Sequence, residues 1–409
     1  MNPEASPSPD KQEADGSLTI ALAMFSILLV AYVLMAADRY LFPVLAVNIR
    51  REFGFSLSNT GLLTTIFTLG LGIGGLPTGY ALSRFSRKSV LLAGIAIFSG
   101  ATAATTIATG FGSMLACLVA SGIGEAMLAT AIFALGANYF SRYRATAIGA
   151  ITLCYGIGGF VGPILATLVL VSYGTWRAPM LAFGLFGFLM IGVIALTVRS
   201  WFSEARGVSA VRANDAQGAP SLLNINTIVL TILGPIQGLG VYGVLGMYPT
   251  FLRENLHYSA TQAGFVVSFY GIGALGAVVG GWIGDRFPPR LVLGTAFVGL
   301  AILGYLFFQT WEPMYVREIL MLFCGLFASA LIYVNVAGYH VKAVKSGLAG
   351  RASGMFITSF YAPSAFGGYL IAELAGRWGW LRAGEMQITL LCLIGAGLVF
   401  VLRPGEMNL

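Results

Sequence analysis

The sequence predicts an all-α membrane protein with twelve transmembrane helices in two pseudo-symmetric bundles of six. The composition, the spacing of apolar runs and an internal repeat all predict this fold class. Hydrophobic residues fill 57% of the 409 positions and charged residues only 10%, whereas a soluble domain carries about 25% charged residues. Glycine occupies 54 positions, and it lets membrane helices pack closely. Soluble enzymes, disordered scaffolds and secreted disulfide frameworks are therefore disfavoured.

A bilayer-length window finds twelve apolar segments. The widest gap follows the sixth, where residues 200–223 are polar and are expected to form a cytoplasmic linker. We expect a disordered cytoplasmic tail over residues 1–17, six-helix bundles over 18–199 and 224–402, and a cytoplasmic tail over 403–409. The twelve segments cover residues 18–49, 58–83, 89–109, 112–140, 145–172, 177–198, 224–252, 259–284, 291–310, 314–340, 352–374 and 385–402.

The basic residues indicate the orientation in the membrane. If successive spans alternate in direction, 15 of the 23 basic residues, including all four lysines, fall on the face that carries both termini. The positive-inside rule makes this face cytoplasmic. We therefore expect a multi-pass protein of the plasma membrane with both termini in the cytoplasm. In a bacterium this is the cytoplasmic (inner) membrane. The basic residues are spread thinly rather than clustered, so nucleic acid is not an expected partner.

The two halves repeat each other in sequence. The loop after the second span, residues 79–88, matches the loop after the eighth, residues 281–290, at an offset of 202. Residues 155–162 of the fifth span match residues 361–368 of the eleventh at an offset of 206. Two matches at nearly one offset indicate duplicated halves that run in the same direction.

Six plus six helices, a central linker and a repeated cytoplasmic loop together resemble the major facilitator superfamily. In that family the loop reads Gly-x-Leu-Ala-Asp-Arg-x-Gly-Arg-Lys, and the resemblance implies that it holds the cytoplasmic gate closed in the outward-open state. The first copy has Ser83 in place of the Asp. The positive-inside rule alone also explains its basic residues. The matching residues are Gly79, Arg84, Arg87 and Lys88 in the first copy and Gly281, Asp285, Arg286 and Arg290 in the second.

Small residues recur along the fifth span. Gly149, Gly158, Gly162 and Pro163 fit a pattern that is common in exporters and antiporters of this superfamily. Small residues at such spacing also let a neighbouring helix approach, and proline kinks a helix. The pattern can therefore reflect close helix packing alone, and it does not by itself indicate the direction of transport.

Three charged residues stand out within the predicted spans, where an ionisable group is costly and is a functional candidate. Glu125 lies near the middle of the fourth span with no basic residue close in sequence. It is the main candidate for binding and releasing a proton. The alternative is that Glu125 stays protonated and only forms a hydrogen bond between helices. Asp38 and Arg39 lie deep if the core of the first span runs from Ser26 to Ile49, and at its outer end if the core stops at Ala37. We favour the deep placement, with the two side chains facing different neighbours because adjacent helical residues diverge.

Asp38-Arg39 together with Gly122-Ile-Gly-Glu125 is similar to the spinster-like branch of the superfamily. The resemblance implies that the acidic residues take part in proton coupling. An Arg that assists the Glu in that branch is absent here, because Leu118 occupies its position. Either Arg39 supplies the counter-charge, or Glu125 switches between neutral and anionic forms without an ion pair.

Polar and aromatic residues on other spans are candidates for lining a central cavity that stacks on and hydrogen-bonds an organic solute. Packing between helices or interfacial belts explain each of them singly. The candidates are Tyr32, Tyr155, Gln237, Tyr242, Tyr270, Asn335 and Tyr361.

No enzyme or ATPase motif is present. Lys88-Ser89 and Lys345-Ser346 follow Arg and Val rather than Gly, so there is no ATP-binding loop. Two histidines in different halves offer no metal or haem site. The sequence therefore predicts a non-enzymatic, cofactor-free and monomeric secondary transporter that moves a small organic solute by alternating access. Proton coupling is expected, by symport or antiport; the alternatives are a proton-independent facilitator or a non-transporting receptor on the same fold.

Overall fold

The computed structural model describes residues 9–140, 143–204, 218–310 and 313–408. Within this part of the chain there is no strand, only an isolated bridge between Ala219 and Val344. The expected tail over residues 1–17 lies partly outside the described residues, and its remainder forms the start of the first helix at Pro9. Most of the expected linker, residues 205–217, also lies outside the described part.

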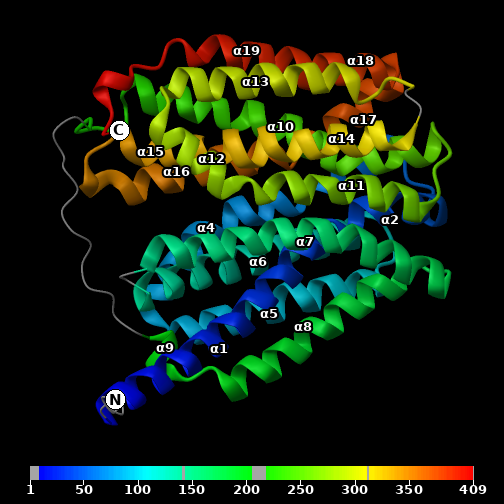
Figure 1. Cartoon of the computed structure of the whole chain (residues 1–409). Helices are drawn as coiled ribbons and strands as arrows, with labels where there is room; N and C mark the ends of the chain where they lie inside the picture. Colours follow the sequence, from blue (N-terminus) through cyan, green and yellow to red (C-terminus); the bar gives the residue numbers. More distant parts are fainter. Residues whose placement is uncertain (1–8, 141–142, 205–217, 311–312, 409) are drawn as a thin grey trace, which may run out of the picture.

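The first half of the chain forms the first six spans, and both termini lie at the same end of the helices (Figure 1). We call this end the terminal end and the opposite end the distal end. The fourth, fifth and sixth spans are single helices, whereas the first two spans are each made of two helices. The elements are α1 (Pro9–Asp38), α2 (Leu41–Phe53), α3 (Leu57–Thr65), α4 (Phe67–Arg84), α5 (Arg87–Ala104), η1 (Thr105–Ile107), α6 (Phe111–Tyr139), α7 (Arg144–Tyr173), α8 (Arg177–Thr197) and α9 (Ser200–Ser203).

The second half forms the last six spans and includes two π-helical segments, η3 and η5. A π-helix inside an α-helix often marks a functional site. The elements are α10 (Ile225–Glu254), α11 (Ala260–Leu275), α12 (Ala277–Arg286), α13 (Pro289–Leu306), α14 (Met314–Cys324), η3 (Gly325–Tyr333), α15 (Val334–Lys342), η4 (Ser346–Leu348), α16 (Ala349–Ser364), α17 (Gly367–Trp378), α18 (Trp380–Gly384), η5 (Glu385–Thr389), α19 (Leu390–Val399) and η6 (Pro404–Glu406).

Proline accounts for two breaks in these spans. Pro43 cannot donate to the carbonyl four residues earlier, and the first span accordingly breaks between α1 and α2. Pro363 precedes the break between α16 and α17. Among the described residues, eleven helical segments are long and apolar enough to cross a membrane. The predicted span over residues 352–374 is the one missing from that set, and the structure forms it as α16 followed by α17.

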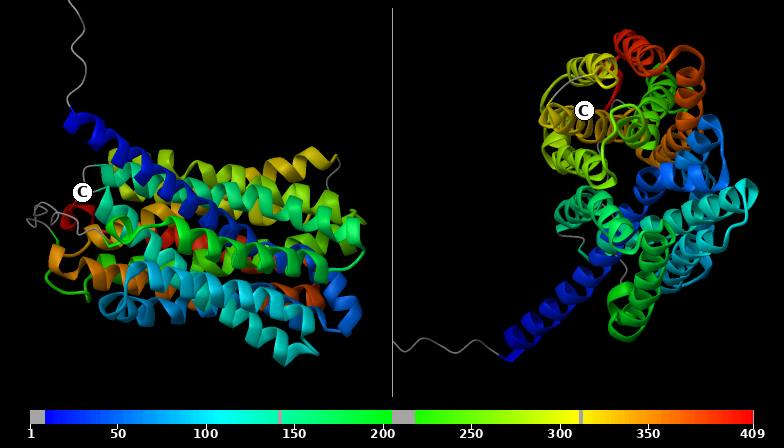
Figure 2. Two further views of the ribbon diagram at one scale, coloured as in Figure 1. Left: turned by 90° about the horizontal axis from the view of Figure 1, so that it is seen from below. Right: turned by 90° about the vertical axis from the view of Figure 1, so that its right-hand side faces the viewer.

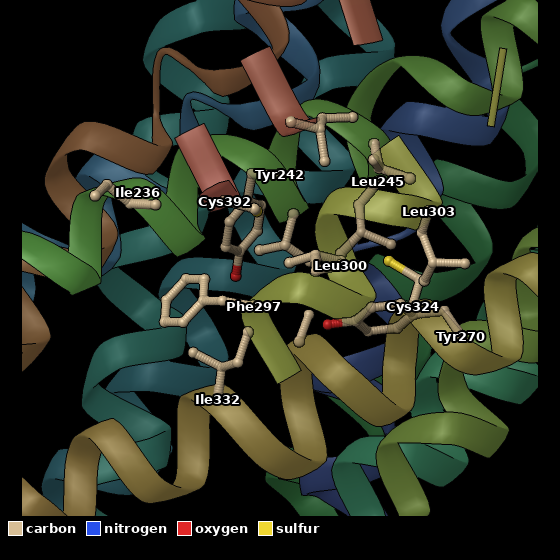
Figure 3. Packing of buried hydrophobic residues seen from close by; sticks show 14 of the residues in the cluster. Ile236, Tyr242, Leu245, Tyr270, Phe297, Leu300, Leu303, Cys324, Ile332 and Cys392 are labelled. Atoms are coloured by element: carbon tan, nitrogen blue, oxygen red, sulfur yellow. The ribbon is translucent and has the colours of Figure 1, made fainter. Parts of the chain in front are cut away.

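The helices divide into two bundles with separate apolar cores, seen end-on in Figure 2. One core contains residues of α1 to α9 almost exclusively, and the other contains mainly residues of α10 to η6. Figure 3 shows part of the second core, where Phe297 and Leu300 of α13 pack among side chains from α10, α11 and η3. Burying these side chains inside each half stabilises it as a unit.

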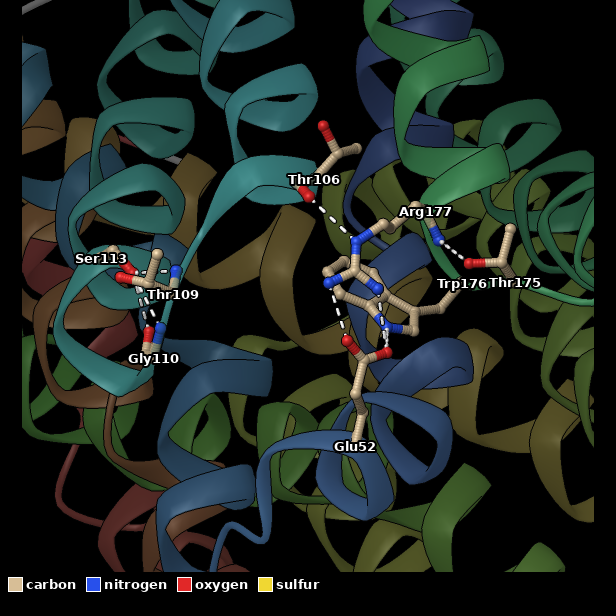
Figure 4. A network of polar contacts seen from close by, with 8 residues as sticks. All are labelled: Glu52, Thr106, Thr109, Gly110, Ser113, Thr175, Trp176 and Arg177. Carbon is tan, nitrogen blue, oxygen red and sulfur yellow. Dashed lines mark hydrogen bonds and ion pairs between the residues drawn. The ribbon is translucent and has the colours of Figure 1, made fainter.

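Polar contacts brace the distal end of the first bundle (Figure 4). Glu52 at the end of α2 accepts from the indole of Trp176 at 2.6 Å and pairs with Arg177 of α8 at 2.7 Å. Arg177 also donates to the carbonyl of Thr106 at 3.0 Å. The network therefore joins α2, η1 and α8 within one bundle.

Candidate transport site

A central cavity of about 500 Å³ lies between the two bundles. Helices α1, α4, α6 and α7 line it from the first bundle, and α10, α11, α12, η3, α15 and α16 line it from the second. The lining is mostly aromatic and aliphatic with a few hydroxyl and amide groups. A largely apolar cavity with sparse polar groups is typical of a binding site for a small organic molecule.

Arg39 lines this cavity and forms an ion pair with Glu125 of α6. The guanidinium Nε donates to Glu125 Oε2 at 2.6 Å, and the two side chains are 7% and 1% exposed. Arg39 lies at the turn between α1 and α2, inside a continuous apolar stretch from Leu18 to Phe53. The side chain is buried within the protein, and its depth in the bilayer stays a prediction. Of the two alternatives left open for Glu125, the geometry has Arg39 as the counter-charge.

Asp38 faces away from the central cavity. Thr102 Oγ1 of α5 donates to both of its carboxylate oxygens at 3.0 Å, and Ser121 Oγ of α6 donates at 3.3 Å. These residues surround a separate small cavity inside the first bundle. As expected from the helical geometry, Asp38 and Arg39 contact different neighbours. A break in a transmembrane helix is where transporters commonly place ion and substrate groups.

Most of the proposed cavity residues line the central cavity, namely Tyr32, Tyr155, Gln237, Tyr242, Tyr270 and Tyr361. Asn335 does not, and this expectation is corrected. Its amide donates to the carbonyls of Gly280 at 3.0 Å and Leu331 at 2.8 Å. It joins helices within the second bundle, and Tyr339 one turn later does the same by donating to the carbonyl of Gly284.

Tyr333 is a cavity residue that the sequence did not reveal. It lines the cavity beside Ser329, and its hydroxyl lies 3.2 Å from that of Tyr361. Tyr333 ends the π-helix η3, whose wider turn rotates the residues after it. A helical wheel with 3.6 residues per turn therefore assigns the wrong face to this stretch. Gln237 Nε2 donates to the carbonyl of Ala328 within η3 at 2.6 Å, which ties α10 to this irregular turn.

The repeated loop residues act within their own bundles in this structure. Lys88 donates to the carbonyls of Ala195 and Val198 at the end of α8, and Arg290 donates to the carbonyl of Leu402 just beyond α19. The two contacts are equivalent in the two halves, and a cation suits a helix C-terminus. In the second copy Asp285 pairs with Lys342 at 2.6 Å. The expected latch between the bundles stays a prediction for the opposite state.

The glycines of the fifth span form packing surfaces on α7. A Cβ at Gly158 would lie 2.5 Å from the Cβ of Ala36 and 2.6 Å from the carbonyl of Val33, so glycine is needed for α1 to approach. Gly162 meets Ala37 in the same way. Gly149 differs, because a Cβ there would find only Val278 at 3.9 Å. The tight part of the pattern thus holds the end of α1 that carries Asp38 and Arg39.

Gly158→Ala is expected to lower stability by about 1–3 kcal/mol, because overpacking forces α1 and α7 apart. Gly149→Ala is the matched control on the same helix. It should be neutral or slightly stabilising, since alanine favours a helix by about 0.5–1 kcal/mol over glycine. Thermal unfolding of the purified variants in detergent measures both. Equal effects of the two substitutions would contradict the packing role.

The two bundles approach closely at the distal end and separate toward the terminal end. Along α3 and α4, a Cβ at Gly61 would overlap the backbone of Gly368. Farther along, a Cβ at Gly72 would lie 3.3 Å from Ala362 and one at Gly75 would lie 3.9 Å from Ile357. The central cavity is therefore closed at the distal end, with the bundles parted at the other.

Polar contacts between the bundles also lie at the distal end. Arg50 of α2 pairs with Glu254 of α10 at 2.6 Å, and Arg253 donates to Asn48 Oδ1 at 2.5 Å. Ser58 of α3 donates to Glu373 of α17 at 2.5 Å. We call this group of contacts the distal latch. Opening the distal end requires all of these contacts to break.

Glu254→Gln is expected to favour the state that is open at the distal end by about 1 kcal/mol, since it removes a partly buried ion pair. That changes the ratio of the two states by a factor of about five. Spin-label distances across the distal end in liposomes measure it. Glu385→Gln is the matched control, because Glu385 is 24% exposed against 23% for Glu254, and it pairs within its own bundle. An unchanged distribution in Glu254→Gln would show that the latch does not hold the closed state.

Comparison with known protein families agrees with this architecture. The family model of the Major Facilitator Superfamily matches residues 28–368 of this chain. The chain belongs to the major facilitator superfamily. As a member, it is a multi-pass membrane protein and a transporter of small organic solutes rather than an enzyme.

Relatives in this superfamily span the chain well. The 4-hydroxybenzoate transporter of Pseudomonas putida is 22% identical over 329 residues and covers 71% of each chain. The cis,cis-muconate transport protein of Acinetobacter baylyi is 24% identical over 356 residues, covering 83% of this chain and 84% of the relative. In fold, the chain is similar to a bacterial homologue of the human lysosomal transporter spinster in an inward-facing, occupied conformation. The TM-score is 0.75 at 17% identity over 97% of both chains, so the expected spinster-like resemblance is confirmed for the fold.

Proposed function

We propose that this chain is a proton-coupled secondary transporter of a small organic solute. Glu125 takes the proton and Arg39 is its counter-charge. The supporting observation is the buried Arg39–Glu125 ion pair at the wall of the central cavity, where the first span is broken. Buried ionisable groups in a membrane bundle are costly, and those beside a cavity mark ion and substrate pathways.

The terminal end is proposed to be cytoplasmic, since most basic residues belong to that face. On this assignment the described conformation faces inward, with the distal latch closed on the outer side. The loops at 79–88 and 281–290 would meet across the terminal end once the bundles rock to the outward-facing state. In the described conformation Lys88 and Arg290 of these loops bind carbonyl groups within their own bundles, which keeps each loop at the terminal end.

Coupling arises because the ion pair and the proton exclude each other. A proton on Glu125 removes the negative partner of Arg39 and weakens their contact. Arg39 is then free to bind solute in the cavity that it lines. Asp38, one residue earlier, acts on the other side of the helix break. With Thr102 and Ser121 it holds the end of α1 against α5 and α6.

An organic acid is the first solute class to test. The two relatives above are named for 4-hydroxybenzoate and cis,cis-muconate. The cavity of this chain carries six tyrosines that can stack on a flat solute and donate hydrogen bonds to it.

Proton coupling is tested with purified protein in proteoliposomes. A pH gradient, acid outside, is imposed while uptake of radiolabelled 4-hydroxybenzoate and of a panel of further organic acids, sugars and amphiphiles is followed. The expected result is accumulation that requires both the protein and the gradient. Equal flux with and without the gradient would point to a facilitator, and binding without flux would point to a receptor.

A further inference from the structure

The charges around the central cavity are very few. Among the described residues that line it, Arg39 is the only one that is charged near neutral pH. Glu125 is not part of the lining; it lies behind Arg39 and is 1% exposed. The cavity therefore presents one guanidinium to a solute, and the matching carboxylate is screened from that solute by the guanidinium itself.

Four states of this site follow from its two ligands, a proton on Glu125 and a solute on Arg39. The empty site is neutral, because the arginine and the carboxylate balance. A proton alone leaves one buried positive charge, and an anionic solute alone leaves one buried negative charge. Proton and monoanion together restore neutrality. Buried charges without a partner are strongly disfavoured in the interior of a membrane protein, so only the two neutral states are suited to the closed intermediate of the transport cycle.

Resting on the proposed function, we infer that the solute is an organic monoanion that moves together with one proton, in the same direction and without net charge. On loading, the proton binds the Glu125 carboxylate, the ion pair breaks, and the guanidinium N–H groups donate to the carboxylate of the solute. On release the same steps run backwards. Antiport of proton and anion is disfavoured, because both of its loaded states carry an unbalanced buried charge. Dianions and organic cations are disfavoured for the same reason.

The surroundings of Arg39 suit a carboxylate on a flat apolar body. Tyr32 and Tyr155 approach from the first bundle, and Tyr242 and Tyr361 from the second. The guanidinium lies 5.5 Å from the ring centroid of Tyr155. Because both bundles contribute, a bound anion draws them together around Arg39, as an occluded state requires.

The other titratable groups near Glu125 do not alter this charge count. They are Asp38, which precedes Arg39 in the sequence, and the phenol of Tyr32. Phenols titrate near pH 10 and stay neutral at neutral pH. Asp38 belongs to the separate small cavity with Thr102 and Ser121, outside the lining of the central cavity.

The inference is tested in two measurements. In detergent, thermal shifts compare 4-hydroxybenzoate, its neutral amide, the dicarboxylate terephthalate and benzylamine, together with a wider panel of monocarboxylates. Monocarboxylates should stabilise the protein most, and more at lower pH. In proteoliposomes, potassium and valinomycin set the membrane potential while a pH gradient drives uptake of the best monocarboxylate. Uptake should not depend on the potential, and the vesicle interior should acidify with uptake.

Reversing the potential would change accumulation by roughly tenfold or more if a net charge moved, and that outcome would overturn the inference. Solute leaving as protons enter would overturn it too, as would stabilisation by the amine or dicarboxylate but by no monocarboxylate. In each of these cases gradient-driven flux can still be present, so proton coupling itself stands. If solute uptake does not depend on the pH gradient, by contrast, the proposed function itself is wrong. The neutral double variant Arg39→Gln/Glu125→Gln keeps the site balanced and should lose at least about tenfold in preference for the carboxylate over its amide.

Discussion

Glu125→Gln is expected to abolish proton-driven accumulation of solute while exchange of solute across the membrane continues. The amide cannot bind a proton, and its oxygen can still accept from Arg39 Nε, which now contacts Glu125 Oε2 at 2.6 Å. For one proton per solute, each unit of pH gradient supports roughly tenfold accumulation in the native protein. In the variant the ratio should fall to that of equilibration. Counterflow in proteoliposomes, with unlabelled solute inside and labelled solute outside, measures the exchange that remains.

Two controls make this result specific. Glu125→Asp retains a titratable carboxyl and should keep coupling, although the shorter side chain reaches Arg39 less well. Glu52→Gln removes a carboxylate from the distal brace of the first bundle, which lies outside the cavity, and should leave accumulation intact. Full accumulation by Glu125→Gln would mean that a group other than Glu125 carries the proton. Loss of both accumulation and exchange would indicate a structural role.

The sequence was enough to predict the architecture because apolar length and charge placement are strong constraints in a bilayer. Eleven of the twelve expected spans correspond to helical stretches in the described residues that are long and apolar enough to cross a membrane. The break at Pro363 divides the remaining one. Glu125 and Arg39 could be named from the rarity of charge within spans. Their pairing was only one of two alternatives, because they are 86 residues apart and the packing of α1 against α6 decides whether they meet.

Other details depended on local geometry that a regular helix does not foretell. The π-helix η3 puts Tyr333 on the cavity and leaves Asn335 facing Gly280. Arg317 near the start of α14 is fully buried. It donates to the carbonyls of Phe307 and Gln309 at the end of α13, where a cation suits the helix dipole. Carbonyl groups at helix ends are partners that sequence patterns do not display.

Arg39→Gln is expected to destabilise the protein by about 3–5 kcal/mol, because it leaves Glu125 buried without its counter-charge. The double variant Arg39→Gln/Glu125→Gln should recover most of this loss, since two amides can hydrogen-bond without any buried charge. Glu125→Gln alone leaves the guanidinium unbalanced and should lie between the native protein and Arg39→Gln. The guanidinium has the ring of Tyr155 at 5.5 Å as a second partner, whereas the carboxylate is 1% exposed.

Apparent thermal stabilities of the four proteins in one detergent complete a double-mutant cycle. A coupling energy of at least about 1 kcal/mol, with the double variant more stable than Arg39→Gln, would support the ion pair as the partner of Glu125. Measured at pH 5 and pH 8, the cost of Arg39→Gln should be smaller at the lower pH, because a protonated Glu125 no longer needs a cation. If the stability losses of the two single variants simply add at both pH values, the two side chains do not interact. The proposed coupling, in which a proton on Glu125 breaks the ion pair, would then be wrong.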